Sequence, residues 1–125
     1  MLGRYPLFYA VSVSPEDNVY LCTGSPRPRD IKTVLNHLMN SSFRESYEGV
    51  RAVQVSSGAA LTDILGDLTK HILVLELPSD VKRFLLIKMA DIEYNLSFAT
   101  IESVQLAALV SAFVLARTMY STHRE

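Results

Sequence analysis

The residues best suited to acid–base or metal chemistry are three histidines, which are dispersed along the sequence. His37 lies among residues of a predicted helix, His71 opens an apolar run, and His123 is close to the end of the sequence. A metal site or a general base would require them to converge with a carboxylate, and the sequence has no zinc, nucleotide-binding or nucleophile motif of recognised spacing. Structural or surface roles are therefore favoured. We predict a non-enzymatic chain with no catalytic residue, no metal and no cofactor.

Two acidic pairs and one small-residue turn are weaker candidates for chemistry. Asp63 and Asp67, at positions i and i+4, would share a helix face and repel each other modestly. Asp91 and Glu93 form the second pair, and a solvated surface is the preferred interpretation of both. The Ser-Ser-Gly turn at residues 56–58 could offer amides and hydroxyls to an anion. Because turns of this composition are common, we interpret it as an ordinary turn.

A basic cluster formed by Arg27, Arg29 and Lys32 is the best exposed candidate for binding. It adjoins two prolines, which argue for a loop in place of regular structure. Loops held by a scaffold commonly carry recognition, so we predict a partner-binding loop that contacts an acidic protein or nucleic acid, with merely solvated charges as the alternative. The net charge of −1, from 12 basic and 13 acidic residues, argues against a dedicated binder of phosphate backbones. Nucleic acid is therefore possible but not favoured.

The single cysteine, Cys22, bears on the cellular compartment. It cannot form an internal disulfide, and it lies in an apolar run where cysteine usually behaves as a small buried hydrophobe. A reactive thiol is the alternative. The N-terminal residues do not have the layout of a signal peptide. We therefore expect a reducing, intracellular and cytoplasmic setting.

The N-terminal part of the sequence predicts a β-hairpin followed by a helix. Residues 5–14 and 19–23 are rich in aromatic and β-branched residues, and the turn-forming residues 15–18 separate them. After the proline-rich loop, Asp30 is well placed to cap a helix. Apolar residues recur at helical spacing between residues 31 and 39, so the helix is amphipathic.

The middle of the sequence predicts further strands. Residues 50–55 alternate between apolar and polar, and residues 71–77 form a nearly continuous apolar run typical of a buried central strand. Between them, residues 61–68 predict a short helix, with a loop as the alternative. Residues 81–89 have two interpretations. A strand paired with the preceding one is favoured, and a helix over residues 79–96 is the alternative.

The last predicted element is a helix over residues 100–120. Its inner part, residues 104–116, is apolar at all but two positions, and it is shorter than the roughly 20 apolar residues that a membrane-spanning helix needs. We therefore expect a core helix, with membrane contact not favoured and residues 121–125 as a frayed tail. A helix without a polar face must be covered on all sides, so we predict a partner subunit on its outer face, in a homodimer or a hetero-oligomer; an ordinary monomer core is the alternative. The candidate interface residues are Leu106, Leu109, Val110, Phe113 and Val114.

These elements together predict one α+β domain over residues 1–125. An antiparallel sheet of about five strands would pack against a helix of the N-terminal half and the apolar C-terminal helix. A mostly helical C-terminal half is the alternative. The element order resembles that of the longin and roadblock group of small profilin-like domains, which begin with a hairpin leading into a helix and close with a strand pair and a final helix. The resemblance implies a non-catalytic scaffold that dimerises and assembles with GTPases or trafficking machinery.

Two functions are compatible with this pattern. The first is a non-enzymatic protein–protein interaction or scaffold module that acts as a homo- or hetero-oligomer. The alternative is a small viral or phage-type accessory factor, or a regulatory factor, that binds a host protein or nucleic acid through the basic segment at residues 27–32.

Overall fold

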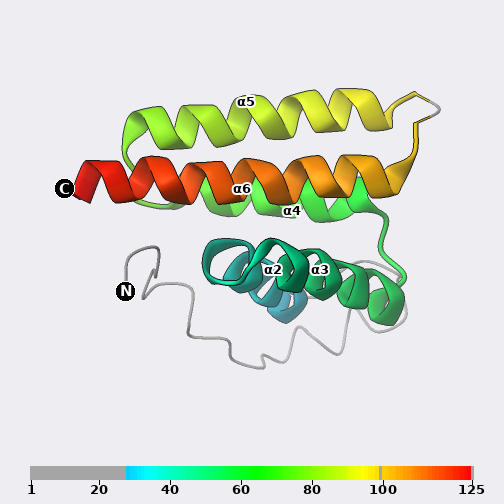
Figure 1. The fold of residues 1–125 in the computed structure, drawn as a ribbon. Coiled ribbons are helices and arrows are strands. Elements are labelled where there is room, and N and C mark those ends of the chain that lie inside the picture. The colour runs from blue at the N-terminus through cyan, green and yellow to red at the C-terminus, as the bar shows by residue number, and fades with distance from the viewer. Residues whose placement is uncertain (1–27, 99, 125) are drawn as a thin grey trace.

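The computed structural model describes residues 28–98 and 100–124, with side chains as far as residue 122. The predicted N-terminal hairpin over residues 5–23 and the thiol of Cys22 lie outside these residues. The described part of the chain is entirely helical and contains no strand (Figure 1). Its helices are α2 Pro28–Asn40, α3 Phe43–Ser57, α4 Leu61–Val74, α5 Ser79–Leu96 and α6 Glu102–Arg124.

The predicted α+β fold is therefore wrong for the described residues, because the segments expected to form the later strands are helical. Residues 50–55 lie in α3, where Val50 and Val53 are buried three positions apart while Val55 is exposed. This spacing is that of a helix. In a segment of six residues, however, the sequence pattern of a helix cannot be distinguished from the alternation of a strand. The resemblance to longin and roadblock domains required a late strand pair, so it fails with the sheet.

The apolar run at residues 71–77 also belongs mainly to a helix. Only Ile72 of the run is buried, and it continues the buried series that runs from Leu61 to Leu68 on the inner face of α4. Leu73 and Val74 face outward. We interpreted this continuous apolar run as a strand buried on both faces. In the structure the run lies at the end of a helix, where some of its apolar side chains face the core and others face the solvent.

Residues 81–89 form part of α5, so the favoured hairpin is wrong and the alternative helix over residues 79–96 agrees with the structure. Val81, Leu85, Met89 and Ile92 are buried, and their spacing of three or four residues places them on one helix face. The helices predicted at residues 31–39 and 100–120 are confirmed as α2 and α6. Helix α6 continues to Arg124 and includes most of the segment that we expected to fray.

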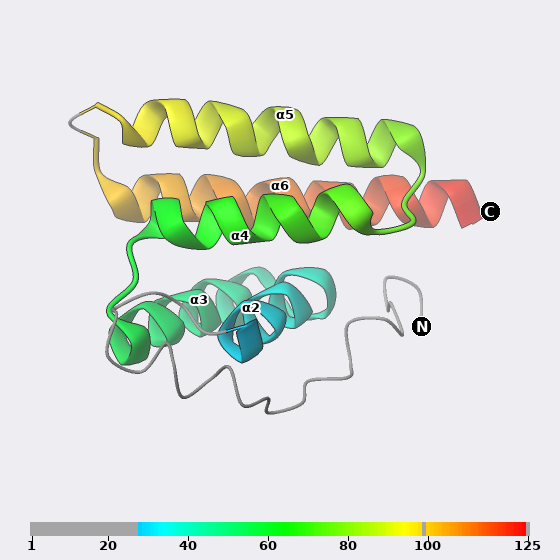
Figure 2. The same ribbon diagram turned by 180° about the vertical axis from the view of Figure 1, so that it is seen from behind.

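Helix α6 lies between α5 and the helical hairpin made by α2 and α3. It packs against α5 on one side and against α2 and α3 on the other (Figures 1 and 2). Helix α4 packs against α5 and α2. The inner faces of all five helices share one hydrophobic cluster, in which Phe113 of α6 is the largest fully buried side chain.

By length and composition alone, Glu102–Thr122 could also cross a membrane, and a third of this window (33%) is buried inside the bundle. Helix α6 packs against three other helices, so one of its apolar faces is buried in a protein core. The same packing leaves an exposed face, which includes Val104 and Leu115.

Local contacts fix the α2–α3 hairpin and attach it to α6. The Ser42 hydroxyl accepts a hydrogen bond from the Glu45 amide, and the Glu45 carboxylate accepts one from the Ser42 amide, which forms a capping box at the start of α3. The Arg117 guanidinium donates to the Ser41 carbonyl over 2.6 Å. The capping box orders the start of α3, and the bond from Arg117 holds the hairpin turn against the C-terminal half of α6.

We predict that Phe113→Ala lowers the free energy of unfolding by about 3–5 kcal/mol, because it leaves a cavity where α6 meets its neighbours. Urea denaturation monitored by circular dichroism measures the change. Leu115→Ala is the matched control, since Leu115 lies on the same helix and is 54% exposed; a change within about 0.5 kcal/mol is expected there. Equal losses in the two variants would contradict this arrangement of the core.

A second prediction concerns Gly49. Glycine often marks the end of a helix, but Gly49 lies within α3. A methyl group there would lie 2.6 Å from the nearest ring carbon of His37, so Gly49→Ala should destabilise the chain by about 1–3 kcal/mol. Gly66→Ala is the control. It meets no atom within 4 Å and should stabilise α4 by about 0.5–1 kcal/mol.

Thermal unfolding of both glycine variants measures these effects, with His37→Ala as a background for Gly49→Ala. Because the clash is with the imidazole ring, Gly49→Ala should lose its cost when that ring is absent. A cost that persists in the His37→Ala background would refute the close approach of α2 to α3.

Candidate protein-interaction surfaces

Two of the three residues of the basic cluster lie in a helix and not in a loop. Arg27 lies outside the described residues, and Arg29 and Lys32 are partly buried in the first turns of α2, which begins at Pro28. The Arg29 carbonyl accepts a hydrogen bond from the Thr33 hydroxyl at 3.0 Å, as the helix continues. The role of the three basic residues in binding a partner stays a prediction.

The predicted interface residues of α6 lie mainly inside the chain's own core. Leu106, Leu109, Val110 and Phe113 are buried, and Val114 is partly buried against the same cluster. Neighbouring helices already cover these side chains, so a partner that meets α6 would contact its opposite face. The exposed face of α6 was not part of the predicted interface, and a partner contact through the five predicted residues stays a prediction.

The histidines described in the structure make local helix contacts. The Nδ1 atom of His37 lies 3.2 Å from the Ser41 hydroxyl, and Nδ1 of His71 lies 2.9 Å from the Asp67 carbonyl. The Asp67 carboxylate pairs with Lys70 at 3.8 Å. Among the described side chains, no group of three histidine, cysteine or acidic residues could hold a metal ion.

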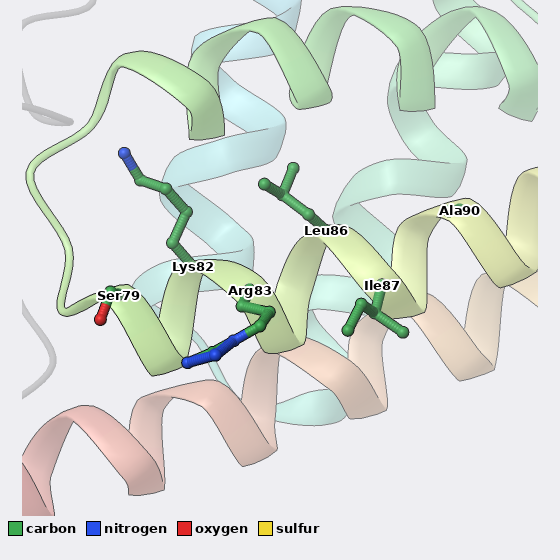
Figure 3. Close-up of a pocket in the computed structure, with 6 residues that line it drawn as sticks. All are labelled: Ser79, Lys82, Arg83, Leu86, Ile87 and Ala90. Atoms are coloured by element: carbon green, nitrogen blue, oxygen red, sulfur yellow. The ribbon is translucent and has the colours of Figure 1, made fainter.

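A surface that sequence reasoning missed is a shallow groove on the outer face of α5. We call it the α5 groove, and its volume is about 390 Å³ (Figure 3). It is lined by Ser79, Lys82, Arg83, Leu86, Ile87 and Ala90. These residues recur every three or four positions along α5, so they share one helix face.

The end of α4 extends the apolar surface beside the α5 groove. The Lys82 ammonium donates a hydrogen bond of 3.1 Å to the Leu73 carbonyl, which brings the end of α4 against the start of α5. Leu73 and Val74 are exposed there, and Ile87 of the groove is 54% exposed. Aliphatic side chains and cations thus alternate on one part of the molecular surface.

A second exposed apolar surface lies where α5 turns into α6. We call it the turn surface, and it comprises Tyr94, Phe98, Ile101 and Val104. The rings of Tyr94 and Phe98 meet edge to face with their centroids 5.0 Å apart. Such a ring pair is preorganised, because each ring restrains the other.

The end of α3 is attached beside the turn surface. The Gln54 amide donates to the Glu102 carboxylate at 3.2 Å. The carbonyl oxygen of the Gln54 side chain is buried and has no hydrogen-bond partner. This bond connects α3 to the first turn of α6, where Val104 begins the exposed face.

Both surfaces depend on a helix that the sequence left ambiguous. The signal for the α5 groove is the recurrence of outward positions 79, 82–83, 86–87 and 90, which is visible only when residues 79–96 are read as one helix. When they are read as a strand, the same residues alternate between two faces and no groove is expected.

Comparison with known proteins gives a family match that covers most of the chain. Residues 26–112 match the model of the replication factor C C-terminal domain, from just before α2 into α6. Replication factor C subunit 3 of Oryza sativa subsp. japonica is 44% identical over 103 residues. Subunit 5 of Arabidopsis thaliana is 40% identical over 104 residues, and subunit 5 of Homo sapiens is 39% identical over 104 residues.

The aligned region is only part of each of these relatives. It covers 82% of this chain but 28% of the rice protein, and 83% of this chain but 31% of the human protein. The chain thus spans about three tenths of the length of the relatives it matches.

Proposed function

The chain belongs to the family of the replication factor C C-terminal domain, and from that premise we propose that it is a helical assembly module of a replication factor C subunit. In this role it binds neighbouring subunits of the same complex. The names of the relatives support the proposal, since each is a subunit of a larger factor.

The observation that carries the proposal is the pair of exposed apolar surfaces on a bundle whose core is already closed. The α5 groove is lined by residues from the start of α5 to Ala90, and the turn surface begins near the C-terminal end of α5 with Tyr94 and continues into α6. Contiguous exposed apolar surface on a folded domain marks sites of interaction. Two different surfaces are what a subunit needs when it contacts two different neighbours, as in a heterologous assembly.

This role retains the interaction module expected from the sequence and replaces the viral or phage alternative, because the relatives are proteins of plants and animals. We propose a hetero-oligomer of replication factor C subunits in preference to a homodimer. Nucleic acid is not a favoured partner, since basic and acidic residues are nearly balanced in number. We assign no catalytic step to this part of the protein.

The family also bears on the cellular location. Proteins named for replication act inside the cell, which agrees with the intracellular part of our expectation. We propose a nuclear location in a eukaryotic cell, in place of the cytoplasmic one expected from the sequence.

Co-expression of the tagged chain with the other replication factor C subunits of the same organism tests this function. We expect at least one subunit to co-purify with the chain and to co-elute in size-exclusion chromatography, because a partner would cover the exposed apolar surfaces. The chain on its own, measured by light scattering, is the control and should have its monomer mass of 14.0 kDa. Failure of every subunit to co-purify, or a stable homodimer of the isolated chain, would contradict the proposal.

A further inference from the structure

We propose that the α5 groove is the docking site for an amphipathic helix of a neighbouring subunit, one that presents apolar side chains and a carboxylate about one helical turn apart. This inference rests on the proposed function and specifies which surface is used and what chemistry the partner presents. The apolar side chains would pack against Leu86 and Ile87, and the carboxylate would pair with Arg83.

The shape of the groove fits a helix. In Figure 3, Lys82 and Leu86 extend from one side of α5 and Arg83 and Ile87 from the other. Ser79 and Ala90, which have small side chains, also line the hollow. Two ridges with small residues between them can accept a ridge of a second helix, which is the usual way in which helices pack.

The length of the groove also suits a helix. From Ser79 to Ala90 it runs about 16 Å along the axis of α5, which corresponds to about three turns of a partner helix. The buried residues of α5, such as Leu85 and Met89, lie on its other side. Among the described helices, those that pack on α5 are α4 and α6, and the residues that line the groove are left partly or fully exposed.

The charge of the groove selects an acidic partner. The residues that line the groove include two basic ones, Lys82 and Arg83, and no acidic one, in a chain whose net charge is −1. Within the described part of the chain, the ion pairs are Arg44–Glu48 and Lys70–Asp67, and neither involves Lys82 or Arg83. The planar guanidinium of an exposed arginine can bind a carboxylate through two parallel hydrogen bonds, so Arg83 is the better anchor.

The apolar part of the surface distinguishes a protein helix from a nucleic acid. A phosphate backbone would use Lys82 and Arg83 but would leave Ile87 and the neighbouring Leu73 exposed to water. An amphipathic helix with a carboxylate one turn from its apolar residues would cover both kinds of side chain at once, since Arg83 and Ile87 are themselves one turn apart.

The test uses the full 125-residue chain and the co-purifying replication factor C subunit, with Arg83→Glu and Ile87→Ser as variants. We expect each to weaken binding by about ten-fold or more, since one opposes a carboxylate and the other removes apolar contact. Lys88→Glu is the matched control. Its charge change is identical in sign to that of Arg83→Glu, but its ammonium lies 5.7 Å from the centre of the Phe84 ring and it does not line the groove. Its effect should stay within about two-fold.

Circular dichroism of each variant verifies that α5 still folds, and Arg83→Gln replaces Arg83→Glu if the charge reversal disturbs the helix. Biolayer interferometry at two salt concentrations measures affinity. The wild-type complex should weaken as salt increases, and the Arg83→Gln complex should weaken less, because it has lost the ion pair.

Five outcomes would overturn the inference, and two of them also overturn the proposed function. Normal binding by Arg83→Glu and Ile87→Ser would remove the groove but leave the assembly role intact. Equal weakening by Arg83→Glu and Lys88→Glu would show only a general charge effect. Duplex DNA released by Arg83→Glu would assign the groove to another occupant. A homodimer dispersed by Arg83→Glu would do the same and would also contradict the proposed hetero-oligomer. Absence of binding by the wild-type chain would refute the assembly role itself.

Discussion

The burial of α6 among three other helices is the contact on which the rest of the structure depends. Leu109 and Phe113 are fully buried, and the face they share meets α5 on one side and the α2–α3 hairpin on the other. Burying each such side chain contributes about 1.5–3 kcal/mol, so this one face supplies a large part of a marginal total stability. Without α6, the α2–α3 hairpin and the α4–α5 pair would be held together mainly by the contact of α2 with α4.

This dependence explains which elements could be predicted from the sequence. Helix α2 has a clear helical period with polar residues opposite, and α6 is apolar over many turns, so both were recognised. Residues 50–55 and 71–77 are short and rich in valine, isoleucine and leucine, which favours a strand when they are considered alone. Packing against neighbouring helices, α6 and α2 for α3 and α5 and α2 for α4, outweighed that preference, because a helix with one buried face can complete the bundle.

The interface predicted from sequence illustrates a different limit. Hydrophobicity shows that Leu106 and Val110 must be covered, but it does not show whether the chain or a partner covers them. The chain itself covers them, and the exposed apolar residues, such as Ile87 and Val104, occur at positions that look ordinary in the sequence. These positions can be identified as exposed only when the arrangement of the helices, and with it the set of core residues, is known.

Helix α5 carries the argument for assembly furthest. Its inner face holds Val81, Leu85 and Met89 in the core. Its outer face presents the exposed Ile87 and the half-buried Leu86 beside two cations. A surface helix that contacts only its own bundle typically has polar residues on its outer face, because polar side chains are well hydrated and expose little apolar area to water. Apolar residues on two faces therefore indicate two contacts. One is the core of this chain, and the other, in our proposal, is a helix from outside it that brings a negative charge to the groove.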